Sequence, residues 1–177
     1  NVMHARKRRK EEGFTLVELI VVVAILGFLL SIAIPRYLTA RTLAAQAATK
    51  ANLHQLASSM ELYMAEHPEV GDTYPPGSSN EGDDVIDWLS AYIPKAPVPP
   101  GGENYRYYAI DTDNNTNNGY ESYVIWDPNP YGGKYFAAGP GGAIGEDSNF
   151  GTAVQKATGQ TVNNLDDPNS GGVPLNW

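Results

Sequence analysis

The residue in this sequence that most clearly calls for a chemical role is Glu18, an acid inside an apolar segment. Residues 14–34 read FTLVELIVVVAILGFLLSIAI, and Glu18 is their single ionisable side chain. A carboxyl group at the centre of a membrane span costs about 2.5 to 3.5 kcal/mol, and less near an end. Such a residue requires a charged partner or a function. The alternative interpretation is an acid without a special role, near the end of a membrane anchor, whose side chain reaches the membrane surface.

A second group of oxygen-bearing side chains lies in residues 111–121, DTDNNTNNGYE. The alternating residues Asp111, Asp113, Asn115 and Asn117 are of the kind that a hard cation such as calcium prefers. The loop lacks the glycine and the closing acid of an EF-hand, and the same residue types are common in solvated turns. We predict no cofactor for this protein. A calcium ion bound by these four residues is the one alternative hypothesis.

The elements that would position these groups begin with a membrane span. Residues 14–34 have the length of about 20 residues that crosses a bilayer as a helix. A basic run at residues 6–10 precedes them, which places the N-terminal end in the cytoplasm and the body outside. The body has 7 basic and 18 acidic residues after position 13, so we expect no nucleic-acid binding through it. The chain contains no cysteine.

Helical periodicity continues beyond the membrane to about Glu66, with Leu53, Leu56 and Met60 on one face. Gly27 and Pro35 are expected to interrupt this helix. Further along we predict a helix at 83–93 and strands at 105–110, 120–126 and 134–138 in an antiparallel meander. Residues 139–177 are read as ordered loop or tail, with a short helix near 152–157.

The expected fold is therefore α+β: a long N-terminal helix with a small antiparallel β-sheet head and extended C-terminal loops. It divides into a basic leader at 1–13, a membrane helix at 14–35, its continuation at 36–67 and a head at 68–177. His54 and His67 have no serine, cysteine or acid around them in a catalytic pattern, so we do not expect an enzyme.

The segment Gly13-Phe14-Thr15-Leu16-Val17-Glu18, after a basic leader and before an apolar helix, resembles the processing motif of bacterial type IV pilins and type II secretion pseudopilins. The resemblance implies that a prepilin peptidase cuts after Gly13 and that Phe14 becomes the methylated first residue. Its new amino group lies four residues from Glu18 and could pair with that acid in the same or the next subunit. Pro35 falls where such pilins carry a helix-loosening proline.

The resemblance implies a structural subunit that waits in the inner membrane and polymerises through its N-terminal helix into an extracellular filament. The implied partners are copies of itself, the peptidase and methyltransferase, membrane lipid, and an assembly platform with an ATPase motor. A pilus for adhesion, motility or DNA uptake is slightly favoured over a periplasmic secretion pseudopilus. A monomeric membrane-anchored binding protein remains as a third alternative, and it predicts no cleavage at Gly13.

Overall fold

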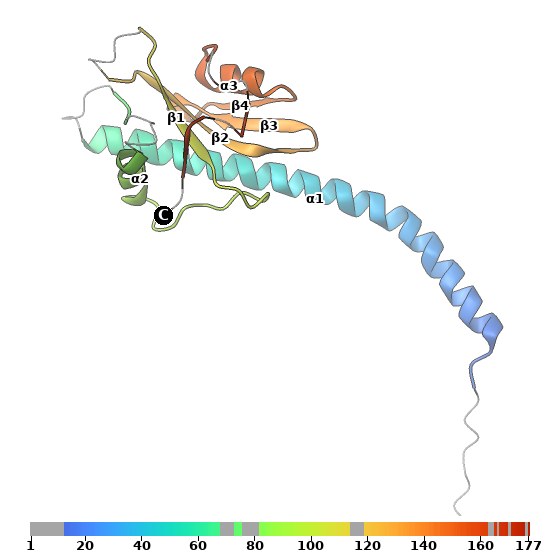
Figure 1. Ribbon diagram of the computed structural model, residues 1–177. Coiled ribbons are helices and arrows are strands. Elements are labelled where there is room, and N and C mark those ends of the chain that lie inside the picture. Colours follow the sequence, from blue (N-terminus) through green and yellow to red (C-terminus); the bar gives the residue numbers. More distant parts are fainter. Residues whose placement is uncertain are drawn as a thin grey trace, which may run out of the picture. The chain divides into compact units, whose positions relative to one another are not determined.

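The computed structural model describes residues 13–67, 73–75, 82–113, 119–162, 165, 167–169, 171–175 and 177, with the side chains of 82–84 left out. The predicted sites Asn115 and Asn117 and residues 1–12 of the basic leader lie outside the described residues. The chain divides into two compact units, Asn1–Ala40 and Arg41–Trp177, and we refer to the second as the head unit. Figure 1 shows the elements along the chain.

The long helix α1 runs from Leu16 to Glu66, which confirms the predicted long helix. It ends where His67 precedes Pro68, because a residue before proline avoids the helical conformation. Gly27 and Pro35 do not break the helix, since α1 continues through both positions. A proline removes one backbone hydrogen bond of the many in a helix of 51 residues, and the helical residues on both sides maintain the rest.

The head unit contains a five-stranded antiparallel sheet in the order β4-β3-β2-β1-β5. Its strands are β1 (Arg106–Ile110), β2 (Ser122–Tyr131), β3 (Lys134–Ala138), β4 (Ile144–Asp147) and β5 (Val173–Pro174). The predicted meander is confirmed in β1, β2 and β3. The prediction of an irregular C-terminal region is wrong for β4 and β5. Neither strand alternates apolar and polar residues over enough positions to be recognised, and each forms by pairing with a neighbour.

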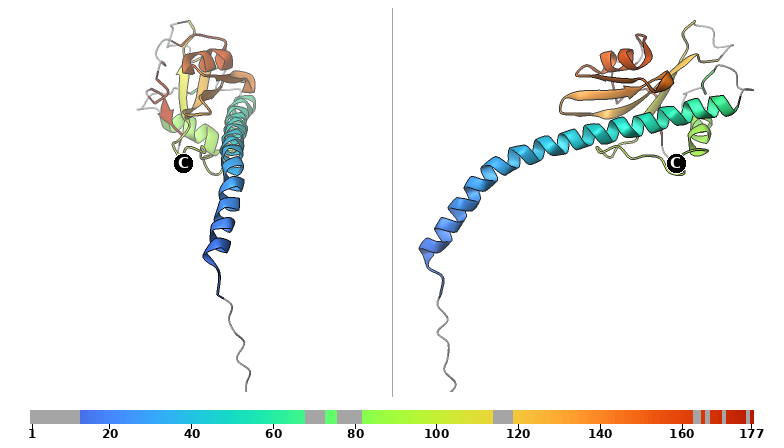
Figure 2. Two further views of the ribbon diagram at one scale, coloured as in Figure 1. Left: turned by 90° about the vertical axis from the view of Figure 1, so that its right-hand side faces the viewer. Right: turned by 180° about the vertical axis from the view of Figure 1, so that it is seen from behind.

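Helices cover both faces of this sheet (Figures 1 and 2). Tyr123 and Ile125 of β2 face the core formed with α1 and with α2 (Gly82–Ser90). Val124 and Trp126, the alternating residues, face the core formed with α3 (Phe150–Thr158). The period of two places successive side chains of β2 on opposite faces, so a single strand contributes to both cores.

Both predicted short helices exist, with different bounds. Helix α2 ends at Ser90 and not at residue 93, although Ile93 is buried in the same core. Helix α3 begins at Phe150, two residues before its predicted start. Asn149 caps it, because its side-chain oxygen accepts a hydrogen bond of 3.0 Å from the backbone N–H of Thr152.

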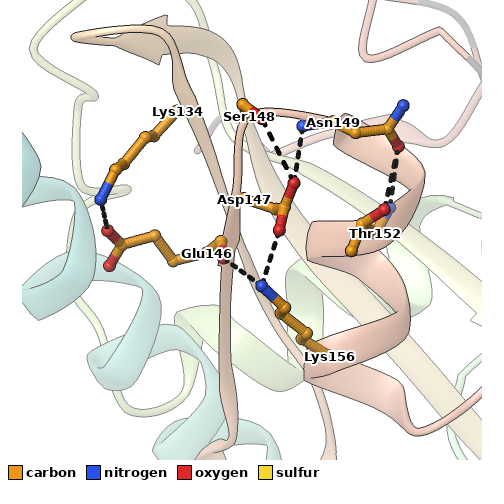
Figure 3. A network of polar contacts seen from close by, with 7 residues as sticks. All are labelled: Lys134, Glu146, Asp147, Ser148, Asn149, Thr152 and Lys156. Atoms are coloured by element: carbon orange, nitrogen blue, oxygen red, sulfur yellow. Dashed lines mark hydrogen bonds and ion pairs between the residues drawn. The ribbon is translucent and has the colours of Figure 1, made fainter.

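Helix α3 lies directly against β4. Gly145 of β4 allows the two backbones to approach closely, because it has no side chain. A Cβ atom built on Gly145 would lie 1.8 Å from the carbonyl oxygen of Ala153 in α3. A polar network next to this contact joins the same two elements (Figure 3). Lys156 of α3 donates to the Asp147 carboxylate at 2.6 Å and to the Glu146 carbonyl at 3.1 Å. The hydrogen bond from Lys156 to its carboxylate is the largest cause that lowers the pKa of Asp147.

A buried acid, Asp127 of β2, helps to join the sheet to α1. Its side chain has 0 % exposed surface. One carboxylate oxygen accepts from the hydroxyls of Thr49 in α1 (3.2 Å) and Tyr131 (3.0 Å), and the other accepts from the backbone N–H of Asn129 (2.9 Å). Burial raises the pKa of Asp127, while these donors act against the rise. We refer to Thr49, Asp127 and Tyr131 as the polar clamp.

Candidate functional site

Three of the predicted processing and assembly residues, Gly13, Phe14 and Glu18, lie close together in sequence at the N-terminal end of α1. Gly13 and Phe14 are exposed and precede the helix. Glu18 accepts hydrogen bonds from the backbone N–H and the hydroxyl of Thr15, at 2.9 and 2.7 Å, and the Glu18 N–H donates to the Thr15 hydroxyl at 3.3 Å. This reciprocal pair is a capping box, which satisfies N–H groups at a helix start.

The role of Thr15 is a feature that the motif reasoning missed. The signal was present in the sequence as Thr-x-x-Glu directly before an apolar run, which is the pattern of a capping box. Glu18 therefore has a partner within its own chain before any second chain or free amino group is present. Its carboxylate is held at the beginning of the helix by Thr15.

The first part of α1 presents apolar side chains outward. The large apolar residues from Phe14 to Ile34 are exposed, at 83 % for Phe14 and 53 % for Ile34. By length and composition α1 can cross a membrane. Within this helix the Pro35 carbonyl accepts a hydrogen bond from the Thr39 hydroxyl at 3.1 Å. A continuous apolar helix surface of this size requires lipid or other protein to cover it.

A second candidate site lies where β1 and β2 meet the loop between them. Ligand oxygens of Asp111, Asp113 and Glu121 all lie within 4.8 Å of one another. Glu121 was missing from the predicted set. The strand register would have indicated it, because Ile110 pairs with Ser122 and the residues next to them are Asp111 and Glu121.

The contacts of Glu121 leave one of its oxygens available. Its Oε2 accepts from the N–H and the hydroxyl of Thr112, at 2.9 and 3.1 Å. Its Oε1 is buried and has no hydrogen-bond partner among the described residues. A buried carboxylate oxygen without a donor is unfavourable, because it loses its water without replacement.

The two histidines considered at the sequence level do not approach these sites. His54 is exposed on α1. His67 stacks on Tyr63 with ring centroids 4.0 Å apart, and Tyr63 stacks in turn on Trp88 at 4.2 Å. His67 thus packs on Tyr63 near the end of α1, and Tyr63 in turn packs on α2.

Comparison with known proteins places this geometry in a family. A family model described as the prokaryotic N-terminal methylation motif matches residues 8–34. The chain is similar to type II secretion system core protein G of Klebsiella michiganensis, with 30 % identity over 135 residues that cover 76 % of this chain and 78 % of that protein. The protein of the same name from Pseudomonas aeruginosa is 29 % identical over 118 residues, covering 60 % and 79 % of the two chains.

A shorter similarity extends to the type IV major pilin protein PilA of Myxococcus xanthus, with 35 % identity over 68 residues that cover 38 % of this chain and 31 % of that protein. The methylation motif, the exposed apolar helix with its single acid, and the small antiparallel head agree with these similarities. This chain therefore belongs to the family of bacterial type IV pilins and type II secretion pseudopilins.

Proposed function

We propose that this chain is a structural subunit of an extracellular or periplasmic filament and polymerises through residues 14–35, which include the first part of α1. The observation that carries the proposal is the exposed apolar helix with Glu18 at its beginning. Lipid covers the helix before assembly and the helices of other subunits cover it afterwards. Because lipid tails are as apolar as leucine, close packing and polar contacts between helices must supply the preference for the filament.

The proposed sequence of events begins with processing in the inner membrane. A prepilin peptidase cuts after Gly13 on the cytoplasmic side and Phe14 is methylated. The new ammonium group then competes with Thr15 for the Glu18 carboxylate, within the subunit or in its neighbour. A buried charge pair contributes more to register than to net adhesion. A platform with an ATPase motor supplies the work of extraction, and the subunit itself is not proposed to catalyse a reaction.

Two kinds of filament are compatible with this proposal. The sequence resemblance slightly favours a pilus, because the pilin family is large and its use in pili is broad. The similarity to core protein G covers 76 % of this chain, against 38 % for the pilin, so it extends well into the head. This difference supports the second candidate, a subunit of a type II secretion pseudopilus. Filaments that form only in cells that carry type II secretion genes would support the pseudopilus. Surface filaments in cells that lack these genes would support a pilus.

We expect Glu18→Gln to be processed normally and to yield about tenfold fewer filaments, because it removes the charge that pairs with the new amino group. Glutamine keeps the oxygen that accepts from Thr15 and so preserves the capping box. Mass spectrometry checks the N-terminus, which should be methylated Phe14, and electron microscopy counts the filaments. A wild-type chain that is intact across Gly13 in its own host would instead indicate a monomeric membrane-anchored protein.

We also propose that Asp111, Asp113 and Glu121 hold a calcium ion in the head unit. The orphaned Oε1 of Glu121 supports this fit, because a cation would satisfy it. When bound, the ion would join the end of β1 to the beginning of β2. The sequence hypothesis also includes Asn115 and Asn117, about which the described residues give no information.

Removal of calcium is expected to lower the stability of the purified head unit. An ion present at 100 times its dissociation constant stabilises a folded protein by about 2.7 kcal/mol. We therefore expect the melting temperature to fall by roughly 10 °C in chelator. The control is Glu121→Gln, which keeps an acceptor for Thr112 and should remove most of the calcium dependence. Equal melting temperatures of the wild type with calcium and with chelator would contradict the proposal.

A further inference from the structure

An open surface groove of about 530 Å³ lies between α1 and the 3₁₀ turn η2 (Pro140–Gly142). Ser58, Glu61 and Leu62 of α1 line it together with Gly141 and Gly142. The two glycines contribute no side chains, so the carboxylate of Glu61 lies beside an open, uncharged surface. All of these residues belong to the head unit.

The hydrogen bonds that described residues donate to the Glu61 carboxylate all involve one of its two oxygens. Its Oε1 accepts hydrogen bonds from the hydroxyls of Tyr74 and Tyr123, at 3.1 and 3.3 Å, and from the backbone N–H of Gly141 at 3.0 Å. Within the described part of the chain no hydrogen bond to Oε2 and no ion pair of Glu61 is found. The side chain is therefore fixed in position through one oxygen while the other remains able to accept a cation.

The basic residues of the head unit leave few candidates for that cation. Lys50 and Lys134 pair with Glu146, and Lys156 pairs with Asp147. Arg106 donates to a backbone carbonyl at 2.9 Å. The remaining two are Arg41 and Lys95, which are exposed and form no ion pair with a described residue.

Arg41 has the position on α1 that a repeating contact requires. It precedes Glu61 by 20 residues on the same helix, which is about 30 Å along the axis and roughly 200° around it. The two residues thus lie on nearly opposite sides of α1. A second copy that is parallel to the first and displaced by about 30 Å can bring its Arg41 beside the Glu61 of the first.

We infer that Arg41 of a second copy of this chain enters the groove and pairs with the Oε2 of Glu61. This inference depends on the filament proposed above. Contact surfaces on opposite sides of a subunit join copies head to tail, and such a contact produces an open filament when it does not close into a ring. The half-exposed Leu62 offers an apolar surface for the arginine stem, and the guanidinium matches a carboxylate geometrically.

Disulfide trapping tests the contact directly, because the chain has no cysteine of its own. The double variant Arg41→Cys/Leu62→Cys should form a ladder of covalent multimers when assembled filaments are oxidised. Both positions lie on one straight stretch of helix about 30 Å apart, so they cannot form a disulfide within one chain. The control Lys95→Cys/Leu62→Cys should give no ladder.

A charge reversal supplies the second readout. Arg41→Glu should reduce filament number about tenfold, because it places two carboxylates together. Lys95→Glu makes the same change of charge at an exposed position and should assemble as the wild type does. If wild-type filaments form but Arg41→Glu assembles equally well and no ladder appears, this contact is wrong and the filament proposal stands. If the wild type forms no filaments, both are wrong.

Discussion

Gly145→Ala is expected to destabilise the head unit by about 3 kcal/mol, because the new methyl group overlaps the backbone of α3. The added Cβ would lie 1.8 Å from the carbonyl oxygen of Ala153 and 2.8 Å from the backbone nitrogen of Ala157. Backbone atoms inside a helix cannot turn away as the end of a side chain can, so α3 must move away from β4. Loss of this contact also weakens the Lys156–Asp147 ion pair.

Thermal unfolding followed by circular dichroism measures this effect, and we expect a decrease of roughly 10 °C in melting temperature. The matched control is Gly151→Ala, the same substitution six residues later in α3. A Cβ there would meet only the Asn149 side chain at 3.4 Å. Alanine should stabilise that position by about 0.5 kcal/mol through reduced backbone entropy of the unfolded chain. Equal melting temperatures for the two variants would contradict close packing of α3 on β4.

Asp127→Leu should destabilise the head unit by about 3 kcal/mol, because it leaves buried donors of the polar clamp without an acceptor. The buried hydroxyl of Thr49 and the partly buried N–H of Asn129 would lose their partner. Asp127→Asn is the control. It keeps the shape of the side chain and one acceptor oxygen, and both hydroxyls of the clamp can rotate to accept from its amide. We expect its free energy of unfolding to lie within about 1 kcal/mol of the wild-type value.

The pH dependence of the free energy of unfolding distinguishes the effect of the Asp127 charge from the effect of the shape of its side chain. Burial raises the native pKa of Asp127 above the ordinary aspartate value of about 3.9. The native state then binds the proton more tightly than the unfolded state does, so this residue stabilises the fold below pH 4 and loses that contribution as the pH rises through the native pKa. The free energy of unfolding of the wild type, relative to Asp127→Asn, should therefore increase on acidification.

Denaturant titrations of both proteins at several pH values measure this difference. Other acids, such as Glu146 with its lowered pKa, titrate equally in the two proteins and cancel in the comparison. A wild-type advantage that decreased on acidification would mean that the hydrogen bonds of the clamp outweigh burial. If Asp127→Leu were as stable as the wild type, the clamp would contribute little to the attachment of α1.

Local patterns were sufficient to predict α1, the three strands of the meander and the two short helices in outline. The apolar run, the helical period of Leu53, Leu56 and Met60, and the alternation in β2 all depend on neighbours in sequence. The motif from Gly13 to Glu18 is also continuous in the chain, so the family was recognisable from these residues. Helix ends were less accurate: α2 ends at Ser90, three residues before its predicted end, while Ile93 still lies in the same core.

Tertiary structure alone decided the features that join distant segments. β4 and β5 exist as strands because β3 and β1 offer partners to them, and Glu121 joins Asp111 because the strand register brings 111 and 121 together. Glu61 has its donors from Tyr74, Tyr123 and Gly141, which are 13, 62 and 80 residues away. Such contacts follow from the register of the sheet and the docking of helices, neither of which is contained in the spacing of residues along one segment.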